Sequence, residues 1–302
     1  MRLETYQHLV DILETSNTPM STQEIATKIQ LSRSVTSLYL NKLLEKGEVQ
    51  QTGKKPVYWQ LTRATTPTTD VFRQYIGSQG SAKKAIEQCK AAMLYPPLGM
   101  PLLIHGASGV GKSFLAKLIY EYLKNEQIIG LEKFYTFNCA DYANNPELLS
   151  SILFGHTKGA FTGAESEKQG LLAQANNSVL FLDEVHRLNA EGQEKLFTFM
   201  DKGNFTRIGE TKPRKAKVRL AFATTEKPQE FLQTFLRRIP IHIYIPNMDE
   251  RGIMEKRQMI EYLFSEESRK LNQPIEVTTR VMNILLQTYY QGNIGEIENT
   301  IK

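Results

Sequence analysis

Apolar residues near the start of the chain recur at the spacing of an α-helix. This pattern predicts three helices, over residues 3–14, 21–29 and 32–46. The second helix opens with the capping box STQE, in which Ser21 and Glu24 satisfy each other's backbone N–H groups. The third helix carries an apolar stripe made of Val35, Leu38, Tyr39, Leu43 and Leu44.

Two strand-like runs follow these helices. EVQQT and VYWQL lie on either side of a Gly/Pro turn, and we expect Tyr58 and Trp59 to pack within the resulting hairpin. Three helices followed by a hairpin predict a winged helix-turn-helix over residues 1–62. Residues 63–70 are rich in Thr and lack a periodic apolar face, which predicts a linker.

From residue 71 onward, short apolar runs alternate with helical segments. The runs are LLIH (102–105), SVLFLDE (178–184), VRLAFATT (218–225) and IHIYIP (241–246). Such alternation predicts an α/β fold over 71–248, with a parallel sheet that binds ligands at the carboxyl ends of its strands. Residues 249–302 have helical patterns only and predict a lid. Because the chain stops within a helical pattern, we expect the lid to be incomplete and further domains to follow.

Composition narrows the class of protein. A chain of 302 residues with 41% hydrophobic residues can form about two cored domains, which excludes global disorder. The sequence has no apolar run of about 18 residues and no signal-peptide pattern at its start, so we expect no membrane span. Cys89 and Cys139 match no metal or disulfide spacing, and we therefore expect a cytoplasmic protein.

The stretch GASGVGKS fits the phosphate-binding pattern G-x-x-x-x-G-K-[ST] between a strand and an apolar helix. Its glycines let backbone N–H groups converge on phosphate oxygens at a helix N-terminus. We expect Lys112 to reach the β- and γ-phosphates of ATP and Ser113 to hold Mg²⁺. The expected nucleotide-binding residues are Gly106, Ala107, Ser108, Gly109, Val110, Gly111, Lys112, Ser113 and Phe114. An ordinary Gly-rich turn would leave the Lys-Ser pair unexplained.

Catalytic candidates lie at the ends of later strands. Asp183 is expected to bind Mg²⁺ and Glu184 to polarise the attacking water, although an isolated Asp-Glu pair also serves as a helix cap. Thr224 is placed to sense the γ-phosphate, or is a structural strand residue. Arg237 and Arg238 precede the last strand, where an Arg can reach a neighbouring subunit's γ-phosphate or simply be solvated.

The segment NCADYANNPELLSSILFGHTKGAFTGA, followed by LFLDEV, resembles the central AAA+ ATPase domain of bacterial enhancer-binding proteins, the activators of sigma-54 RNA polymerase. The resemblance covers about 75–302, and GAFTGA is its most specific element. The GKS ending, FLRRIP and GNIGEI are similar to the subgroup typified by the levanase operon regulator. That subgroup joins an N-terminal DNA-binding domain to C-terminal sugar-phosphotransferase regulatory domains.

The resemblance implies a function and partners. It implies a homo-oligomeric ring, commonly a hexamer, that hydrolyses ATP to convert closed promoter complexes of sigma-54 RNA polymerase into open ones. It also implies binding to upstream DNA, control of a sugar phosphotransferase-system operon, and contact with phosphotransferase-system proteins through further C-terminal domains. The sigma-54 contact is expected from Gly159, Ala160, Phe161, Thr162, Gly163 and Ala164. From composition alone, packing of Phe161 into its own domain remains the alternative.

Four further positions carry over from the family or depart from it. Asn138 matches the Asn that pairs with the catalytic Glu, here Glu184. Arg238 matches the arginine that acts on a neighbouring subunit. The more upstream Arg of the family falls near Leu232, so Arg237 is its expected substitute. Where the family has a lid Arg, this chain has Gly295, and no sensor Arg is available there.

Two groups of polar residues are candidates for contact with DNA. In the third helix and the hairpin turn these are Arg33, Ser34, Thr36, Ser37, Asn41, Lys54 and Lys55. The stretch 207–219 is basic, with Glu210 as its only acid, and we expect it to lie beside the GAFTGA loop in the ring pore. Solvated surface for the stretch and a protein-interaction role for the winged helix remain the alternatives.

Two other functions suit a phosphate loop joined to a winged helix. A DNA motor or helicase loader would show DNA-stimulated ATPase activity without polymerase, and the GAFTGA segment argues against it. A regulator that senses nucleotide without hydrolysis would not turn over ATP, and Glu184 argues against it.

Overall fold

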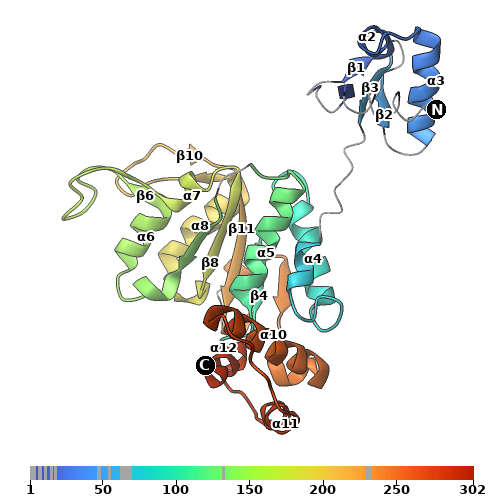
Figure 1. Ribbon diagram of the computed structural model, residues 1–302. Helices are drawn as coiled ribbons and strands as arrows, with labels where there is room; N and C mark the ends of the chain where they lie inside the picture. Colours follow the sequence, from blue (N-terminus) through green and yellow to red (C-terminus); the bar gives the residue numbers. More distant parts are fainter. Residues whose placement is uncertain are drawn as a thin grey trace. The chain divides into compact units, whose positions relative to one another are not determined.

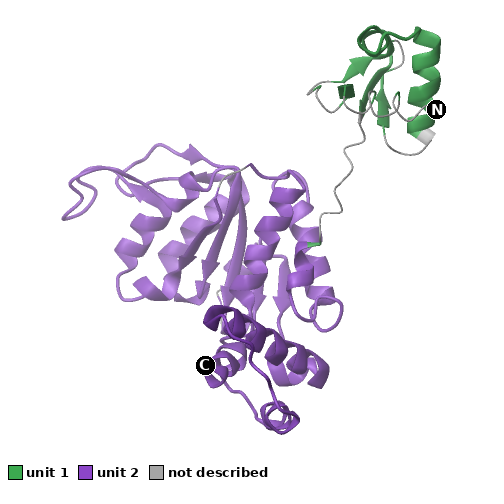
Figure 2. Cartoon of the chain, in the orientation of Figure 1, with its two compact units in different colours: residues 1–70 green, residues 71–302 purple. Residues whose placement is uncertain are grey.

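The computed structural model describes residues 5, 9, 12–13, 16, 19–45, 49–53, 56–61, 70–130, 133–228, 231 and 233–302. The chain forms two compact units, residues 1–70 and 71–302, shown in different colours in Figure 2. Lys54, Lys55, Leu232, the predicted linker apart from Asp70, and most of the helix predicted over 3–14 lie outside the described residues.

The elements of the first unit whose bounds the structure describes are two helices and a three-stranded antiparallel sheet. The helices are α2 (Thr22–Lys28) and α3 (Arg33–Glu45), and the sheet has the order β1 (Met20–Ser21), β3 (Tyr58–Leu61), β2 (Val49–Thr52). The predicted capping box is present, because Ser21 N–H donates to Glu24 Oε2 at 2.7 Å and Glu24 N–H donates to Ser21 Oγ at 3.3 Å. Trp59 packs in the core, and its indole donates to Thr22 Oγ1 at 2.8 Å.

The buried face of α3 differs from the predicted stripe. Val35 and Leu38 are 38% and 56% exposed, whereas Thr36 is fully buried and its hydroxyl donates to the Ser32 carbonyl at 3.0 Å. Thr36, Leu40 and Leu43 occupy the inner face at steps of four and three residues. The prediction that Thr36 contacts DNA is therefore wrong, because its hydroxyl is already satisfied inside the unit.

The second unit is built on a parallel five-stranded sheet with the order β12-β4-β11-β8-β5 (Figure 1). Its strands are β4 (Leu102–His105), β5 (Tyr135–Asn138), β8 (Ser178–Asp183), β11 (Val218–Thr224) and β12 (Ile241–Tyr244). The sequence predicted four of them. It missed β5 because YTFN is short and only Phe137 in it is buried.

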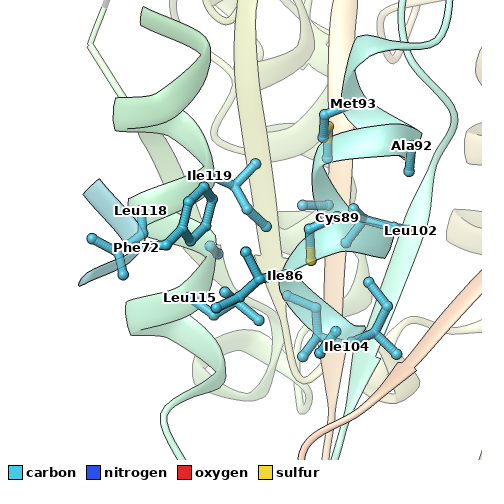
Figure 3. Packing of buried hydrophobic residues seen from close by; sticks show 14 of the residues in the cluster. Phe72, Ile86, Cys89, Ala92, Met93, Leu102, Ile104, Leu115, Leu118 and Ile119 are labelled. Atoms are coloured by element: carbon cyan, nitrogen blue, oxygen red, sulfur yellow. The ribbon is translucent and has the colours of Figure 1, made fainter. Parts of the chain in front are cut away.

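Alternate residues along the sheet pack into opposite hydrophobic cores, as the two-residue period of a strand requires. In β4, Leu102 and Ile104 join one core and Leu103 joins the other. The first core is shown in Figure 3, where Leu102 and Ile104 meet Ile86, Cys89 and Met93 of one helix and Leu115, Leu118 and Ile119 of the next. The sheet is therefore buried on both faces, which agrees with the nearly continuous apolar runs of its strands.

Helices cover both faces of the sheet. The face in Figure 3 is covered by α4 (Lys83–Leu94) and α5 (Lys112–Asn125). The other face is covered by α6 (Pro146–Phe154), α7 (Leu171–Gln174), α8 (Ala190–Lys202) and α9 (Gln233–Leu236). Between these elements lie short antiparallel pairs, β6 (Gly155–His156) with β7 (Lys168–Gln169) and β9 (Asn204–Phe205) with β10 (Arg214–Lys215).

The lid follows β12. It consists of a short 3-10 helix, η5 (Met248–Arg251), then α10 (Ile253–Leu271), α11 (Thr279–Gln287) and α12 (Asn293–Ile301). These elements share a core of their own that includes Met248, Ile260 and Ile297. They lie at the end of the sheet where β4 leads into the phosphate-binding loop (Figure 1). Among the described residues, none of the helices has both the length and the apolar character needed to cross a bilayer.

Candidate functional site

The predicted phosphate-binding loop connects β4 to α5 and depends on glycine at close backbone contacts. Gly106, Gly109 and Gly111 have φ values of +156°, +74° and +98°, a range that favours glycine. A Cβ atom at Gly106 would lie 2.5 Å from the Ile245 carbonyl oxygen, and one at Gly109 would lie 2.4 Å from the Gly292 carbonyl oxygen. The loop can therefore approach both the last strand and the lid.

Lys112 lies at the first position of α5 and is only 6% exposed. Its ammonium group donates to the carbonyls of Gly106 at 2.9 Å and Ala107 at 3.0 Å. Burial lowers the pKa of Lys112, while the carboxylates of Glu184 and Asp183 act in the opposite direction. A buried ammonium beside a helix N-terminus is a site where the negative charge of a phosphate offsets the cost of burial.

Ser113 and Asp183 are brought together from α5 and the carboxyl end of β8. The Ser113 hydroxyl donates to Asp183 Oδ2 at 2.9 Å. A hydroxyl and a carboxylate side by side form an oxygen donor pair of the kind Mg²⁺ uses together with phosphate oxygens and water. The two residues therefore fit the predicted metal role.

Glu184 follows Asp183 with a left-handed backbone, φ +47°. Its Oε2 atom accepts hydrogen bonds from the backbone N–H of Thr225 at 3.3 Å and from the Thr225 hydroxyl at 2.9 Å. His186 Nδ1 lies 3.2 Å from the same oxygen. Because a carboxylate only accepts hydrogen bonds, the His186 ring must carry a proton on Nδ1 to stabilise this contact.

Thr224 takes part in the same network but does not face the cavity. It is fully buried, its hydroxyl accepts from the Glu226 N–H at 3.0 Å, and His186 Nδ1 lies 3.0 Å from it. The Thr224 side chain is thus linked to Glu184 through His186. Sequence reasoning missed both His186 and Thr225, although each follows a strand end that had already been singled out.

Asn138 does not make its predicted pair with Glu184. Both residues lie in the described part of the chain, and the register of β5 places Asn138 opposite Asp183. The Asn138 amide nitrogen instead donates to Asp141 Oδ1 at 3.1 Å, and its oxygen accepts from the Ala140 N–H at 3.0 Å. The reason is local, because Asn138 caps the short 3-10 helix η2 (Cys139–Tyr142).

A cavity of ≈ 440 Å³ lies over these groups. The loop, both carboxylates and the lid contribute to its wall, and Gly106, Ala107 and Val110 are not among the residues that line it. Phe114, which lines it, stacks on Tyr75 with ring centroids 6.1 Å apart. On the lid side the cavity is lined by Met259, Tyr262, Leu263, Ile294, Gly295 and Glu298. Its size and mixed polar and apolar wall suit a nucleotide.

The two candidate arginines do not line this cavity in the described part of the chain. Arg237 is exposed. Arg238 donates to Asp201 Oδ2 at 2.9 Å and to the Thr234 carbonyl at 2.8 Å, and its guanidinium lies 5.2 Å from the centre of the Phe197 ring. Neither arginine is therefore among the residues that line this cavity.

The GAFTGA segment forms a tight loop between β6 and β7 that projects beyond the sheet (Figure 1). Gly159 N–H donates to the Ala164 carbonyl at 2.8 Å, and a Cβ atom at Gly159 or Gly163 would meet nothing within 4 Å. Thr162 is exposed at the tip. Phe161 is half-buried with its ring edge-on to His156 at 5.0 Å, so the loop's own base shields part of the ring.

The basic stretch 207–219 lies directly against the base of this loop. The Thr157 N–H donates to the Ile208 carbonyl at 3.0 Å, and the Ile208 N–H donates to the Gly155 carbonyl at 2.9 Å. Arg207 bridges the two segments through Glu167 at 3.1 Å and Glu210 at 2.9 Å. The structure thus joins two segments that the sequence separates by about 45 residues.

Comparison with known proteins agrees with this arrangement. Residues 75–243 match the family described as sigma-54 interaction domain. The chain is 44% identical over 238 residues to the transcriptional regulatory protein LevR of Bacillus subtilis, which covers 78% of this chain and 26% of LevR. It is 37% identical over 314 residues to the transcriptional regulatory protein DagR of Salmonella typhimurium, which covers 94% of this chain and 34% of DagR. The chain therefore spans about a quarter to a third of the length of these relatives.

A solved structure shares the fold. NtrX from Brucella abortus in complex with ATP superposes with a TM-score of 0.63 at 20% sequence identity, over 92% of this chain and 60% of that one. At this identity the likeness concerns the fold alone. The family match covers more than half of the chain, including the phosphate-binding loop, the Asp183–Glu184 pair and the GAFTGA loop. The chain belongs to the sigma-54 interaction domain family of AAA+ proteins.

Proposed function

We propose that this chain hydrolyses ATP and uses the energy to open promoter complexes of sigma-54 RNA polymerase. The observation that carries the proposal is the 2.9 Å hydrogen bond between Ser113 and Asp183, which unites the phosphate loop and the acidic strand end in one site. The family match supports the same conclusion, as do the two relatives, which are transcriptional regulators by name.

Each side chain has a role that follows from its position. Lys112 leaves the carbonyls of Gly106 and Ala107 to bind the β- and γ-phosphates. Mg²⁺, held by Ser113 and Asp183, would neutralise phosphate charge. Glu184 accepts hydrogen bonds in this structure and is placed to orient the attacking water, since its carboxylate lines the cavity beside Lys112.

A homo-oligomer completes the proposed site. Arg238 is held away from its own cavity by Asp201, so we assign it to the phosphates of a neighbouring subunit, with exposed Arg237 beside it. In such a ring, the commonest form being a hexamer, every subunit presents a GAFTGA loop. The exposed Thr162 and the half-buried Phe161 are the groups we propose to contact sigma-54.

The first unit is proposed to hold upstream DNA. Arg33, Ser34 and Asn41 are exposed on α3, and Ser37 is partly exposed, so these side chains are free to contact a groove. Lys54 and Lys55 belong to the same proposal but lie outside the described residues. Control of a sugar phosphotransferase-system operon, and regulation by proteins of that system, rest on likeness to LevR alone.

The test is promoter opening by purified chain, ATP and sigma-54 polymerase on supercoiled DNA. Thr162→Ala should lose open complexes at least tenfold and keep more than half of the ATPase rate, because Thr162 is exposed at the loop tip and is not among the residues that line the cavity with Lys112. Thr198→Ala, an exposed Thr on α8, is the matched control and should open promoters normally. Normal opening by Thr162→Ala would sink the assignment of the loop.

A second arm separates this function from that of a DNA motor. With polymerase omitted, a motor would still separate strands or show an ATPase rate stimulated by DNA. The proposed activator should do neither. Glu184→Gln serves as the catalytic control in both arms, since it should bind ATP while its hydrolysis falls by a factor of about 10² to 10⁴.

A further inference from the structure

The lid binds the phosphate loop through the loop's own carbonyl groups. The Asn293 side-chain amide donates to the Ser108 carbonyl at 3.0 Å, and the Ile294 N–H donates to the Gly109 carbonyl at 3.1 Å. Arg251, buried in η5, donates to the next carbonyl, that of Val110. Three consecutive loop carbonyls are therefore held by lid groups, in addition to the two held by Lys112.

These contacts fix the direction of the loop's N–H groups. In a planar trans peptide, the carbonyl of one residue and the N–H of the next point to opposite sides. Carbonyls that face the lid therefore turn the following N–H groups away from it, toward the side where a phosphate is bound. Any movement of the lid tilts these peptide planes and changes how well the N–H groups of the loop fit an anion.

Asn293 is the junction of this arrangement. It is only 2% exposed and has a left-handed backbone with φ +52°. Its side-chain oxygen accepts from the Met248 N–H of η5 at 2.9 Å while its nitrogen holds Ser108. One amide thus ties together the phosphate loop, the segment that leads from the sheet into the lid, and the start of α12.

At Gly295 the lid has no side chain that could contact nucleotide directly, and Arg251, the lid cation that also lines the cavity, is buried and donates to the Val110 carbonyl. Gly295 lines the cavity, and a Cβ atom there would meet nothing within 4 Å. A long side chain would fit, yet none is present. The described contacts between the lid and the phosphate loop therefore run through backbone carbonyls.

We propose that Asn293 is the positioning residue through which the lid responds to bound nucleotide. It acts on the phosphate-binding loop through the Ser108 carbonyl. This inference rests on the proposed ATP site and adds how its occupancy reaches the lid. Phosphate binding orders the loop N–H groups, the opposite carbonyls align with Asn293 and Ile294, and α12 is held more firmly. Loss of nucleotide loosens the same bonds.

The test removes the side chain without straining the backbone. Asn293→Gly in the full chain accepts the positive φ and deletes the side-chain hydrogen bonds to Met248, Ser108 and Gln291. We expect the dissociation constants of ATP and ADP to rise about tenfold, because a buried carbonyl loses its donor. Hydrogen–deuterium exchange over 290–301 should slow on nucleotide binding in the wild-type chain and not in the variant.

The matched control is Asn272→Gly. Asn272 also lies in the lid, with φ +51°, but is exposed at the end of α10. It should behave as wild type in both measurements. Wild-type affinity together with retained nucleotide-dependent protection of 290–301 in Asn293→Gly would overturn the proposal.

Two further variants keep the test decisive if Asn293→Gly is poorly folded. Asn293→Asp retains an acceptor for Met248 but cannot donate to Ser108. The nucleotide-dependent protection of residues 290–301 should therefore still be lost, and its retention would contradict the proposal. Adding Gly295→Arg to Asn293→Gly should restore affinity by direct contact with phosphate, which a purely structural defect would not allow. Binding and exchange need no polymerase, so failure of promoter opening alone would count only against the proposed function.

Discussion

At the scale of single residues, the position of Glu184 depends on neighbours that have no role in binding phosphate. Thr225 gives its oxygen two hydrogen bonds, and His186 approaches the same atom. A carboxylate that must orient water gains from such fixed donors, because they limit its rotamers. The Asp-Glu motif predicts metal binding and activation of water. The orientation of the Glu184 carboxylate, in contrast, depends on Thr225, which follows the adjacent strand β11.

The Thr225 hydroxyl provides the sharpest residue-scale prediction. Thr225→Val keeps the side chain's shape and the backbone N–H but removes a hydrogen bond to a charged group. We expect kcat for ATP hydrolysis to fall about tenfold with little change in the ATP dissociation constant. Steady-state kinetics and nucleotide titration measure the two quantities separately. An unchanged kcat would show that the hydroxyl does not position Glu184.

At the scale of elements, Glu210 pairs with Arg207 and Arg214 of the basic stretch, and Arg207 in turn pairs with Glu167, which follows the GAFTGA loop. Hydrogen bonds from Arg214 and then Arg207 lower the pKa of Glu210 from 4.5 to about 2. Because the pKa in the folded chain is depressed, the contact is complete above the ordinary pKa and is lost as the pH falls from about 4.5 toward 2. Around neutral pH the two arginines stay paired, and the base of the loop stays ordered.

This charge network is tested by following the Glu210 carboxyl carbon by NMR. In the wild-type chain its chemical shift should stay that of a carboxylate down to about pH 3, since the pKa is about 2. In Arg214→Gln, protonation should begin at higher pH, because the largest cause of the shift is removed. Lys212→Gln changes the stretch's charge equally and is the control. Equal titration of all three proteins would show that the Arg214 pair is absent in solution.

At the scale of the whole molecule, the proposed role of Arg238 in a neighbouring subunit can be tested by mixing variants. Arg238→Ala should bind ATP normally and lose hydrolysis by a factor of about 10³, the effect expected of an arginine that acts on transition-state charge. Glu184→Gln should also be inactive alone. Mixed subunits should regain activity, because a Glu184→Gln subunit supplies Arg238 to the intact site of its neighbour. No recovery on mixing would place Arg238 in a role within its own chain.

Much of the site was visible in the sequence because its parts are contiguous. The phosphate loop, the Asp183–Glu184 pair and the GAFTGA loop are each a few adjacent residues whose spacing reflects local backbone geometry. The pairing of Asn138 was predicted wrongly, since the choice between Glu184 and Asp141 depends on how η2 turns after β5. The burial of Thr36 was missed for a similar reason, because the rotation of α3 is set by its packing against α2 and β2.

The sequence by itself determined the fold class, the phosphate chemistry and the family, because hydrophobic periodicity and short motifs encode local structure. Only the tertiary structure decided which groups from distant segments meet. It placed Thr225 and His186 on Glu184, joined 207–219 to the GAFTGA loop, and set Asn293 against Ser108, 185 residues away along the chain. Contacts of this kind depend on the register of parallel strands and on how the lid packs, and no local pattern specifies either.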